Sequence, residues 1–490
     1  MHNPTARIPR SSICLFIIFL SFSCSKDSDL LEAESIIDPH KENLVVKEYV
    51  VDDIFNVAPG ESTILDVLEN DNLSNLESVK IVEITQPENG EVVIIEEKTL
   101  QYIPAEEQQE SSSSEVDTFT YTVDVETEEG TTVTEEATVT VEVTEENSVI
   151  ENGPIPSSVL YWKDKFDNGW GTYAAEINEF SKSGNKNQEY YYFAYYIDGI
   201  VNMWQATGDN SYLDTVIGLV DETMNDAVPM GQYLGWPSAS GEAVPLWDSF
   251  YWRIVATLTR IMHQSPNLRS NQDYQAAYER LLAFSEKNIW ERYEGEAWHF
   301  YRVNTHMASH WARIGMELYT ITGKQKYKEV FDNISFGTMV GHPSNLRNQL
   351  RQNSNVPSAY DWSSNWNGSN NQDTSHAGAI ISFWVAAYET DMYWNQQDIN
   401  ALISTFEDVI CPNELTQGRE FVNGSGGYNT HYSWLHEWLT LGRYSQEIQN
   451  KIEAHYSNRT SLGYVGIQPV GIAALNAKIL ADGRAYYPEN

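Results

Sequence analysis

The chain has 490 residues and carries 70 Asp and Glu against 30 Lys and Arg, which gives a formal net charge of −40. The charge is uneven, because residues 1–156 hold 34 acidic and 7 basic residues whereas residues 157–490 hold 36 and 23. Nucleic-acid binding needs a basic surface, so this composition excludes DNA and RNA as partners, and the acidic first part is typical of a solubilising surface.

The N-terminus has the pattern of an export signal. Arg7 and Arg10 precede an apolar run from Ile13 to Phe22, which is too short to span a bilayer as a permanent helix. The run ends at Leu20-Ser21-Phe22-Ser23-Cys24, and this ending resembles a bacterial lipobox. An ordinary secretory signal is the alternative interpretation.

The resemblance implies that the chain is a lipoprotein. Residues 1–23 would be the signal peptide, Cys24 the acylated first residue, and residues 24–44 a flexible tether. The segment Ser25-Lys26-Asp27-Ser28-Asp29 resembles the surface-export tag of lipoproteins from the Bacteroidetes group. Since acyl chains hold soluble domains at membranes, we expect an exported protein at the outer membrane or cell surface.

The cysteines exclude a disulfide framework. The chain has three of them, Cys14, Cys24 and Cys411. With Cys14 removed and Cys24 acylated, Cys411 has no partner, and no cysteine cluster remains that could bind zinc.

Residues 45–145 have the pattern of an all-β domain. Val, Thr, Ile and Glu alternate, as in Thr118–Val123 and Ala137–Val141, and period-two alternation of β-branched residues favours half-buried strands. Turn-forming residues recur at Pro59-Gly60 and Pro87–Gly90. The pattern predicts a β-sandwich of about a hundred residues.

The landmarks of this segment resemble the bacterial Ig-like or cadherin-like repeat. They are Val67–Asp71, Pro87–Gly90, Tyr102–Pro104 and Asp117–Tyr121. Such modules usually act as spacers, and some bind calcium or glycan, which the sequence leaves open here. Residues 146–157 are predicted to be the linker that follows.

From residue 158 onward the apolar period changes to that of helices. Apolar residues recur at helical spacing in five segments: Ala194–Gln205, Leu213–Met224, Trp252–Met262, Ala308–Thr320 and Ile380–Tyr388. A chain of this length can bury one large core, so residues 158–490 are predicted to form one all-α catalytic domain.

Two helix junctions share the pattern Thr-Gly-x-x-x-Tyr, at Thr207–Tyr212 and Thr322–Tyr327. Glycine is expected to end the first helix of each pair as a C-cap. These junctions resemble those of (α/α) toroids, which many carbohydrate-active enzymes use. The expected architecture is therefore an N-terminal Ig-like sandwich followed by an (α/α) toroid, and other helical repeats could give the same junctions.

Histidines are concentrated in this helical part. We expect His299, His306, His310 and Arg313 to share one helical face, with Asn304 at the start of that helix. The His306–His310 spacing could hold a metal, but Met307 stands where a zinc protease would need Glu. We therefore predict no metal and no other cofactor.

A second histidine follows a capping signal. Asp373 or Thr374 is the expected N-cap of a helix, which places His376 in its first turn. The positive end of a helix disfavours imidazolium, so His376 is predicted to be neutral.

Other candidate binding residues lie in predicted loops. Trp362 and Trp366 stand in a turn-rich loop and could stack on sugars, although a core position is the alternative. Asn429 and His431 follow a glycine run. Arg347 and Arg351 stand where a site for an anionic sugar would need cations, or could belong to a solvated helix face.

These residue types suit β-elimination on a uronic acid. A base removes the C5 proton, hydrogen-bond donors or cations stabilise the charge that develops on the carboxylate, and an acid protonates O4. Glycoside hydrolysis instead needs two carboxylates across the bond. Asp248, Asp361, Asp373 and Glu437 are available for that, but no sequence pattern pairs them.

The helical part resembles the toroidal polysaccharide lyases that cleave alginate, glucuronan or ulvan. The resemblance implies that Asn304 and His306 sit at the uronate, that Tyr360 is the acid, that Arg347 or Arg351 binds the carboxylate, and that His376 supports the site. Asn304 and His306 are not adjacent, which departs from some alginate lyases. His310 or His431 could therefore take over a role.

We predict a polysaccharide lyase acting on an anionic, uronate-containing polymer. A toroidal glycoside hydrolase, including one acting on unsaturated uronyl oligosaccharides, is the first alternative. A surface glycan-binding lipoprotein without activity is the second. The sequence gives no oligomeric state.

Overall fold

The structure, a computed structural model, describes thirteen segments of the chain. They are residues 50–57, 62–65, 67–68, 71, 79–95, 97–105, 115–126, 131–143, 154–183, 188–368, 370–429, 432–459 and 465–486, with the side chains of residues 56, 115, 126, 142, 143, 429 and 432–434 excepted. The predicted signal peptide, Cys24 and tether lie outside these residues, as do residues 146–153 of the predicted linker. The chain divides into two compact units, Met1–Glu146 and Asn147–Asn490.

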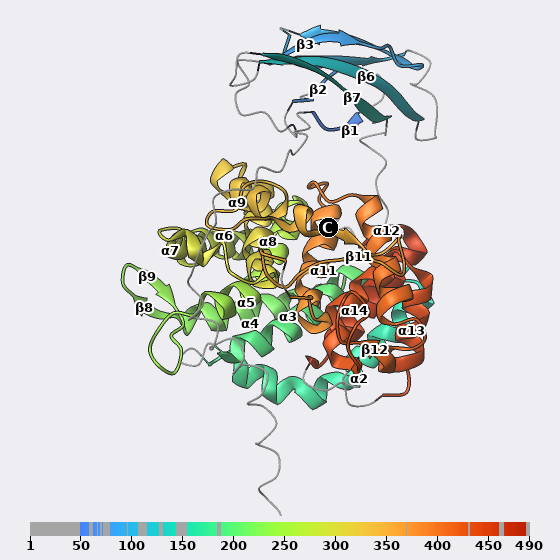
Figure 1. Ribbon diagram of the computed structural model, residues 1–490. Helices are drawn as coiled ribbons and strands as arrows, with labels where there is room; N and C mark the ends of the chain where they lie inside the picture. The colour runs from blue at the N-terminus through green and yellow to red at the C-terminus, as the bar shows by residue number, and fades with distance from the viewer. Residues whose placement is uncertain are drawn as a thin grey trace, which may run out of the picture. The chain divides into compact units, whose positions relative to one another are not determined.

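The first unit is a sandwich of two sheets (Figure 1). In one sheet, a parallel edge pair is followed by antiparallel pairs, in the order β1 (Asp53–Val57), β7 (Thr132–Val143), β6 (Glu115–Glu126) and β3 (Val79–Ile84). The other sheet is antiparallel, in the order β2 (Thr63–Leu65), β5 (Thr99–Pro104) and β4 (Gly90–Ile95).

The alternation predicted from the sequence is present in β6. Tyr121, Val123 and Val125 are buried, whereas Thr120 and Thr122 are only partly so. Successive side chains of a strand point to opposite faces, so the first set forms the core between the sheets. The Ig-like interpretation of this part of the chain is confirmed.

A buried carboxylate fixes the predicted turn at Pro87–Gly90. Asp117 accepts hydrogen bonds from the backbone N–H groups of Glu88 and Asn89, both at 3.1 Å, and from the Tyr102 hydroxyl at 2.9 Å. These donors satisfy a charge that would otherwise be costly to bury. The turn landmark and the strand landmark of the Ig-like pattern are therefore physically linked.

The second unit is a toroid of helices. Among the described residues, six inner helices pack side by side in a closed ring (Figure 1). In ring order they are α3 (Gln188–Thr207), α5 (Pro245–His263), α8 (Thr305–Thr322), α11 (Thr374–Tyr388), η9 (Tyr432–Arg443) and α14 (Gln468–Asp482), after which α14 packs on α3.

An outer helix covers each part of the ring, and the chain alternates between the layers. The outer helices are α2 (Ser157–Phe180), α4 (Asn210–Asn225), α6 (Gln272–Phe284), α9 (Gln325–Ser335), α12 (Gln396–Ser404) and α13 (Gln446–Tyr456). Two of them continue as π-helical segments, η5 (Ser285–Trp290) and η7 (Thr405–Ile410). The predicted (α/α) toroid is thus confirmed by the packing of this chain itself.

The two glycine junctions behave as predicted. Gly208 and Gly323 have φ of +68° and +67°, a conformation that favours glycine, and each ends an inner helix. Tyr212 and Tyr327, at the start of the following outer helices, are buried. All five segments predicted to be helical lie within observed helices.

Connection lengths differ between the two faces of the toroid. Inner helices pass to outer helices through short links such as residues 208–209, 323–324 and 444–445. Outer helices return through long links such as residues 226–244 and 336–373. Because the layers run in opposite directions, the long links all start and finish at the end where the inner helices begin, and we call this end the mouth.

The long links carry the remaining short elements. They are β8 (Val228–Met230), β9 (Tyr233–Gly235), α7 (Glu291–Tyr293), η6 (Ala297–His299), α10 (Leu346–Gln349), β10 (Arg351–Gln352), β11 (Tyr360–Asp361), η8 (Leu415–Gln417), β12 (Gly418–Arg419) and β13 (Tyr428–Asn429), whereas η4 (Leu268–Ser270) lies in a link from an inner to an outer helix. No helix among the described residues is sufficiently long and apolar to traverse a bilayer.

Candidate active site

The first turn of α11 holds an Asp–His pair. Asp373 is the N-cap and accepts a hydrogen bond from the backbone N–H of His376 at 3.0 Å, as the sequence predicted. Both carboxylate oxygens of Asp373 also lie 2.9 Å from Nδ1 of the His376 ring. Nδ1 must therefore carry the proton that is shared with the carboxylate, and Nε2 is the nitrogen that points away from it.

The carboxylate of this pair stays ionised. Burial raises the pKa of Asp373, but hydrogen bonds from His376 and Ser375 outweigh burial and hold that pKa well below its usual value. An ionised partner at Nδ1 increases the basicity of an imidazole and fixes its orientation. That His376 itself is neutral stays a prediction.

A second imidazole faces this pair. The ring centroids of His306 and His376 are 4.4 Å apart, with 33° between the ring planes. Burial lowers the pKa of His306 well below its usual value, and the neighbouring His376 lowers it further because two imidazolium rings this close would repel each other. His306 is therefore a neutral ring, and its Nδ1 has no hydrogen-bond partner among the described residues.

His310 lies deeper, one turn further along α8. It is 1% exposed, its Nδ1 is 3.5 Å from the Ser249 hydroxyl, and its ring packs on Phe250 at 5.2 Å. Burial and the nearby Arg253 lower its pKa well below the usual value. His310 therefore supports the floor of the site and is too enclosed to bind a sugar directly, which corrects its predicted role.

Asn304 lies at the start of α8, as predicted, and acts as its N-cap residue. Its Nδ2 lies 3.8 Å from the Met307 sulfur, a weak contact for an amide donor. The half-buried Asn304 amide can therefore still serve a ligand beside His306.

A cation that the sequence analysis did not single out stands beside His306. Arg302 is partly buried, and its positive charge is one cause of the lowered pKa of His306. Its guanidinium lies over the ring of Trp298, 5.4 Å from the centroid, and Trp298 is 53% exposed. The only signal in the sequence was proximity, because both residues lie within the six positions that precede Asn304.

The predicted face of four residues is only partly correct. His306, His310 and Arg313 lie on α8 and are buried. His299, however, lies in the separate 3-10 turn η6, because α8 begins only at Thr305. It bonds the Tyr293 carbonyl at 3.0 Å and is not part of the pair formed by His306 and His376.

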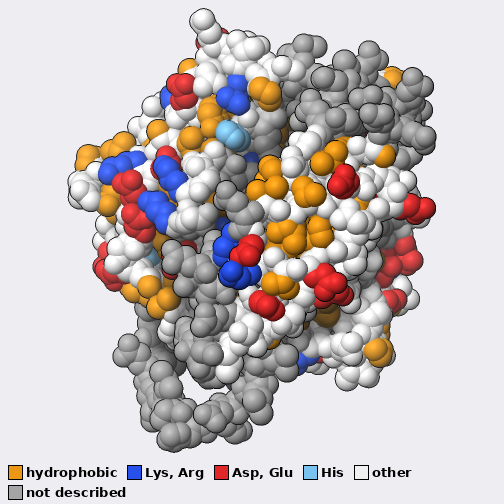
Figure 2. Space-filling view, turned by 90° about the horizontal axis from the view of Figure 1, so that it is seen from above, with side chains coloured by type: hydrophobic (Ala, Val, Ile, Leu, Met, Phe, Trp, Pro, Cys, Tyr) orange, Lys and Arg blue, Asp and Glu red, His pale blue; other side chains and the backbone are white. Residues whose placement is uncertain are grey.

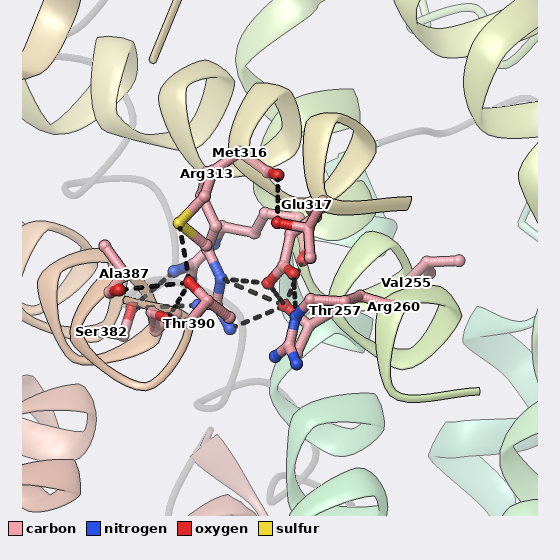
Figure 3. Close-up of polar contacts among 12 residues, drawn as sticks. Val255, Thr257, Arg260, Arg313, Met316, Glu317, Ser382, Ala387 and Thr390 are labelled. Atoms are coloured by element: carbon pink, nitrogen blue, oxygen red, sulfur yellow. Dashed lines mark hydrogen bonds and ion pairs between the residues drawn. The ribbon is translucent and has the colours of Figure 1, made fainter. Parts of the chain in front are cut away.

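Beneath the histidines, the toroid interior is filled by ion pairs. Figure 3 shows Arg260 and Arg313 converging on Glu317 and Thr257. Arg253, one helical turn before Thr257 on α5, forms an ion pair with Glu437. The cavity between these groups has a volume of only about 40 Å³, which suffices for water but not for a sugar. The interior therefore has no room for a ligand of that size between these groups.

Aromatic rings line the other half of the mouth. Tyr191 on α3 stacks on Phe250 of α5 at 4.0 Å, and Tyr195 packs edge-on against His436 of η9 at 4.7 Å. Since Phe250 also contacts His310, these contacts connect the histidine site to the starts of α3 and α5.

Tyr360 and Arg347 are not brought to the histidines. The Tyr360 hydroxyl donates to Asp398 at 3.2 Å, and Arg347 binds both oxygens of Asp398 at 2.7 and 2.8 Å. Asp398 is in the first turn of outer helix α12, which begins at the end of the toroid opposite to the mouth. Both side chains are therefore engaged in packing β11 and α10 against α12, which contradicts their predicted positions in one cleft with His306.

Further predicted binding residues are engaged elsewhere. Arg351 pairs with Asp361 at 2.7 Å across the β10–β11 hairpin. Trp362 and Trp366 are 1% and 3% exposed, so they are core residues and cannot be sugar platforms. His431 lies outside the described residues, as does the side chain of Asn429.

Two of the carboxylates that hydrolysis could use, Asp248 and Glu437, are buried in contacts with other side chains. Asp248 is buried and accepts hydrogen bonds from Arg292 and, at 2.6 Å, from Tyr293. Glu437 is buried against Arg253. Neither forms a pair of carboxylates facing a cleft, which is the arrangement that glycoside hydrolysis requires. On the face drawn in Figure 2, Lys and Arg side chains are interspersed with Asp and Glu and form no continuous basic surface.

Comparison with known proteins assigns the first unit. A family model described as a bacterial Ig domain matches residues 46–142. No curated protein matches the chain.

Solved structures resemble the chain at low identity. An inactive variant of alpha-1,6-mannanase GH76A from Salegentibacter sp. HEL1_6, in complex with alpha-1,6-mannotetrose, is 13% identical, with a TM-score of 0.38 over 66% of this chain and 99% of that chain. A glycosyl hydrolase family 88 protein from Bacteroides vulgatus is 12% identical, with a TM-score of 0.41 over 65% and 99%. These likenesses are too distant to assign an activity, which must be argued from the site itself.

Proposed function

We propose that the chain is a polysaccharide lyase that cleaves a uronate-containing polymer by β-elimination at the mouth of the toroid. The observation that carries the proposal is the Asp373–His376 pair facing neutral His306, with Arg302 beside them. This group contains an oriented base, a neutral hydrogen-bonding ring and a cation, and elimination from a uronate needs all three.

The reaction assigns a role to each residue. Nε2 of His376 takes the C5 proton, the electron pair of that C–H bond forms the C4–C5 double bond, and the C4–O4 bond breaks. The His376 imidazolium then returns the proton to the departing O4. Asp373 stabilises this imidazolium by its charge, as a carboxylate does for the histidine of a hydrolase triad.

The substrate carboxylate needs partners of its own. Removal of the C5 proton moves negative charge onto this group, and a cation or a hydrogen-bond donor placed there lowers the barrier. Arg302 supplies the cation, and neutral His306 and the Asn304 amide supply hydrogen bonds. Tyr360, Arg347 and Arg351 have no part in this mechanism, because their polar groups are engaged with Asp398 and Asp361.

We further propose that the chain is an exported lipoprotein acylated at Cys24, which the lipobox-like segment supports. An enzyme fixed at the cell surface would meet polymers that are too large to enter the cell. Metabolic labelling with a palmitate analogue, compared with Cys24→Ala, tests this assignment, and equal labelling of both chains would refute it.

The activity is tested by incubating the full chain with alginate, glucuronan and ulvan and following the absorbance of the conjugated enol ether. Wild type should generate this absorbance on at least one polymer, and His376→Ala should abolish it. New reducing ends without the chromophore would instead show the hydrolase alternative, which is supported by two carboxylates, Glu189 and Glu242, lining one pocket of the mouth.

A further inference from the structure

A second pocket opens at the mouth, outside the histidine site. Its volume is about 440 Å³, within the range of small-molecule sites. It is lined from the starts of α3 and α5 and from the link between α4 and α5, by Gln188, Glu189, Ser238, Ser240, Glu242 and Trp247 among others. Nothing in the elimination described above uses these residues.

Trp247 distinguishes this pocket from the tryptophan-rich core. Trp362 and Trp366 are almost fully buried. Trp247 is only partly buried, and its side chain makes no hydrogen bond or ring contact with any described residue. An indole ring that borders an open pocket in this way is a platform on which the C–H face of a sugar can stack.

The charge of the pocket differs from that of the histidine site. Among the described residues, its lining includes two carboxylates, Glu189 and Glu242, and no Lys or Arg. Arg302, in the link that precedes α8, carries the opposite charge at the histidine site. Like charges that face each other at short range repel, so the pocket disfavours a sugar that carries a carboxylate or sulfate.

The pocket and the histidine site are neighbours around the ring. The pocket is built on α3 and α5, whereas the catalytic residues are on α8 and α11, and α5 packs on α8. Phe250 lies one turn beyond Trp247 on α5 and contacts His310, which is one turn from His306. A polymer lying across the mouth can therefore place one sugar at each site.

We propose that this pocket is a subsite for a neutral, unsulfated sugar adjacent to the uronate that undergoes elimination. The inference rests on the proposed lyase function and makes it more specific. Its consequence is that the substrate is a mixed polymer in which uronate alternates with a neutral sugar, and that a polymer of uronate alone is a poor substrate.

Three polymers test whether the pocket prefers a neutral, unsulfated sugar: chemically desulfated ulvan, native ulvan and glucuronan. We expect kcat/KM to be highest on desulfated ulvan. The double variant Glu189→Gln/Glu242→Gln should raise the ratio of kcat/KM on glucuronan to kcat/KM on desulfated ulvan by about tenfold, equivalent to about 1.4 kcal/mol; an unchanged ratio would contradict the role of the two carboxylates. A control, Asp164→Asn/Glu279→Gln on outer helices α2 and α6, removes the same charge far from the mouth and should change neither rate.

Binding provides a readout that does not depend on catalysis. In the His376→Ala background, calorimetry should show tighter binding of desulfated ulvan fragments than of glucuronan fragments, and Trp247→Ala should remove this preference. A preference for glucuronan, equal affinities, or no binding of any fragment would each overturn the subsite. If the preference is present but wild type produces no chromophore from any polymer, the lyase proposal fails and the subsite stands.

Discussion

The substitution Asp373→Asn isolates the charge of the Asp–His pair from its structural role. Asn is as good an N-cap as Asp, so α11 should begin at the same residue and the thermal midpoint should hardly change. The variant loses the negative charge that both Asp373 oxygens present to Nδ1 of His376 at 2.9 Å. A hydrogen bond to a charged group contributes about 2–3 kcal/mol, which corresponds to a fall in kcat of about 30- to 150-fold.

The assay is the initial rate of enol-ether absorbance, measured with the thermal midpoint of the same preparation. Asp209→Asn is a matched control, because Asp209 is also an N-cap aspartate, accepting from Ser211 at the start of outer helix α4. It should retain wild-type kcat. If Asp373→Asn also keeps kcat within threefold of wild type, the carboxylate does not assist His376, and the assignment of His376 as the base is wrong.

Three further predictions concern single residues. Tyr360→Phe should leave kcat within twofold of wild type. Because it removes one hydrogen bond to Asp398, it should lower the free energy of unfolding, measured by urea titration, by about 1 kcal/mol. A fall in kcat above tenfold would instead support Tyr360 as the catalytic acid. Arg302→Gln should lower kcat/KM for the uronate polymer by about 10- to 100-fold through the loss of one charged contact, whereas Arg351→Gln, measured in the same assay, should not.

The third of these concerns the Ig-like unit, where burial raises the pKa of Asp71 from 3.8 to about 7. An unfolded chain ionises this carboxyl near pH 4 and the folded unit only near pH 7, so stability is greatest below pH 4 and falls as pH rises through that window. The full difference corresponds to about 4 kcal/mol, which solvent screening of a partly buried carboxyl reduces to about 2 kcal/mol. Urea titrations at pH 4 and pH 7 should show this loss, and Asp71→Asn should remove it; an unchanged pH dependence in the variant would contradict the assignment.

The parts of the fold that the sequence predicted are those determined by local chemistry. Period-two alternation in β6 and helical spacing in α3 or α8 follow from which face of each element is buried. Gly208 and Gly323 were recognisable because the left-handed conformation at a helix end favours glycine. The pairing of Asp373 with His376 is local in the same sense, since an N-cap side chain reaches only the next three residues.

The predictions that failed depended on partners distant in the sequence. In the sequence, Arg347 and Tyr360 have the residue types of a substrate-binding cation and a catalytic acid. In the structure both bind Asp398, which follows the tyrosine by thirty-eight residues. Trp362 stands in a turn-rich segment for which the sequence left both a sugar platform and a core position open, and its ring packs against Trp384 and Trp438 from two inner helices. Residue type and spacing carry no information about such contacts, because they arise only when the ring of helices closes.

The same closure places cations beside the proposed site, although the whole chain has a net charge of −40. Three guanidinium groups stand below or beside the histidines, on Arg253, Arg302 and Arg313, and all three contribute to lowering the pKa of His306 or His310. Arg253 and Arg313 are buried, so salt screens their fields much less than it screens the acidic groups on the surface. Arg253 and Arg313 are paired with the buried carboxylates of Glu437 and Glu317, and the cavity beside them is too small to admit a sugar, so in the proposed mechanism Arg302 is the cation for the substrate carboxylate. Burial is the largest cause of the low pKa of both imidazoles and the nearby guanidinium groups lower it further, so neutral His306 stands beside the cation of Arg302 although the whole chain is acidic.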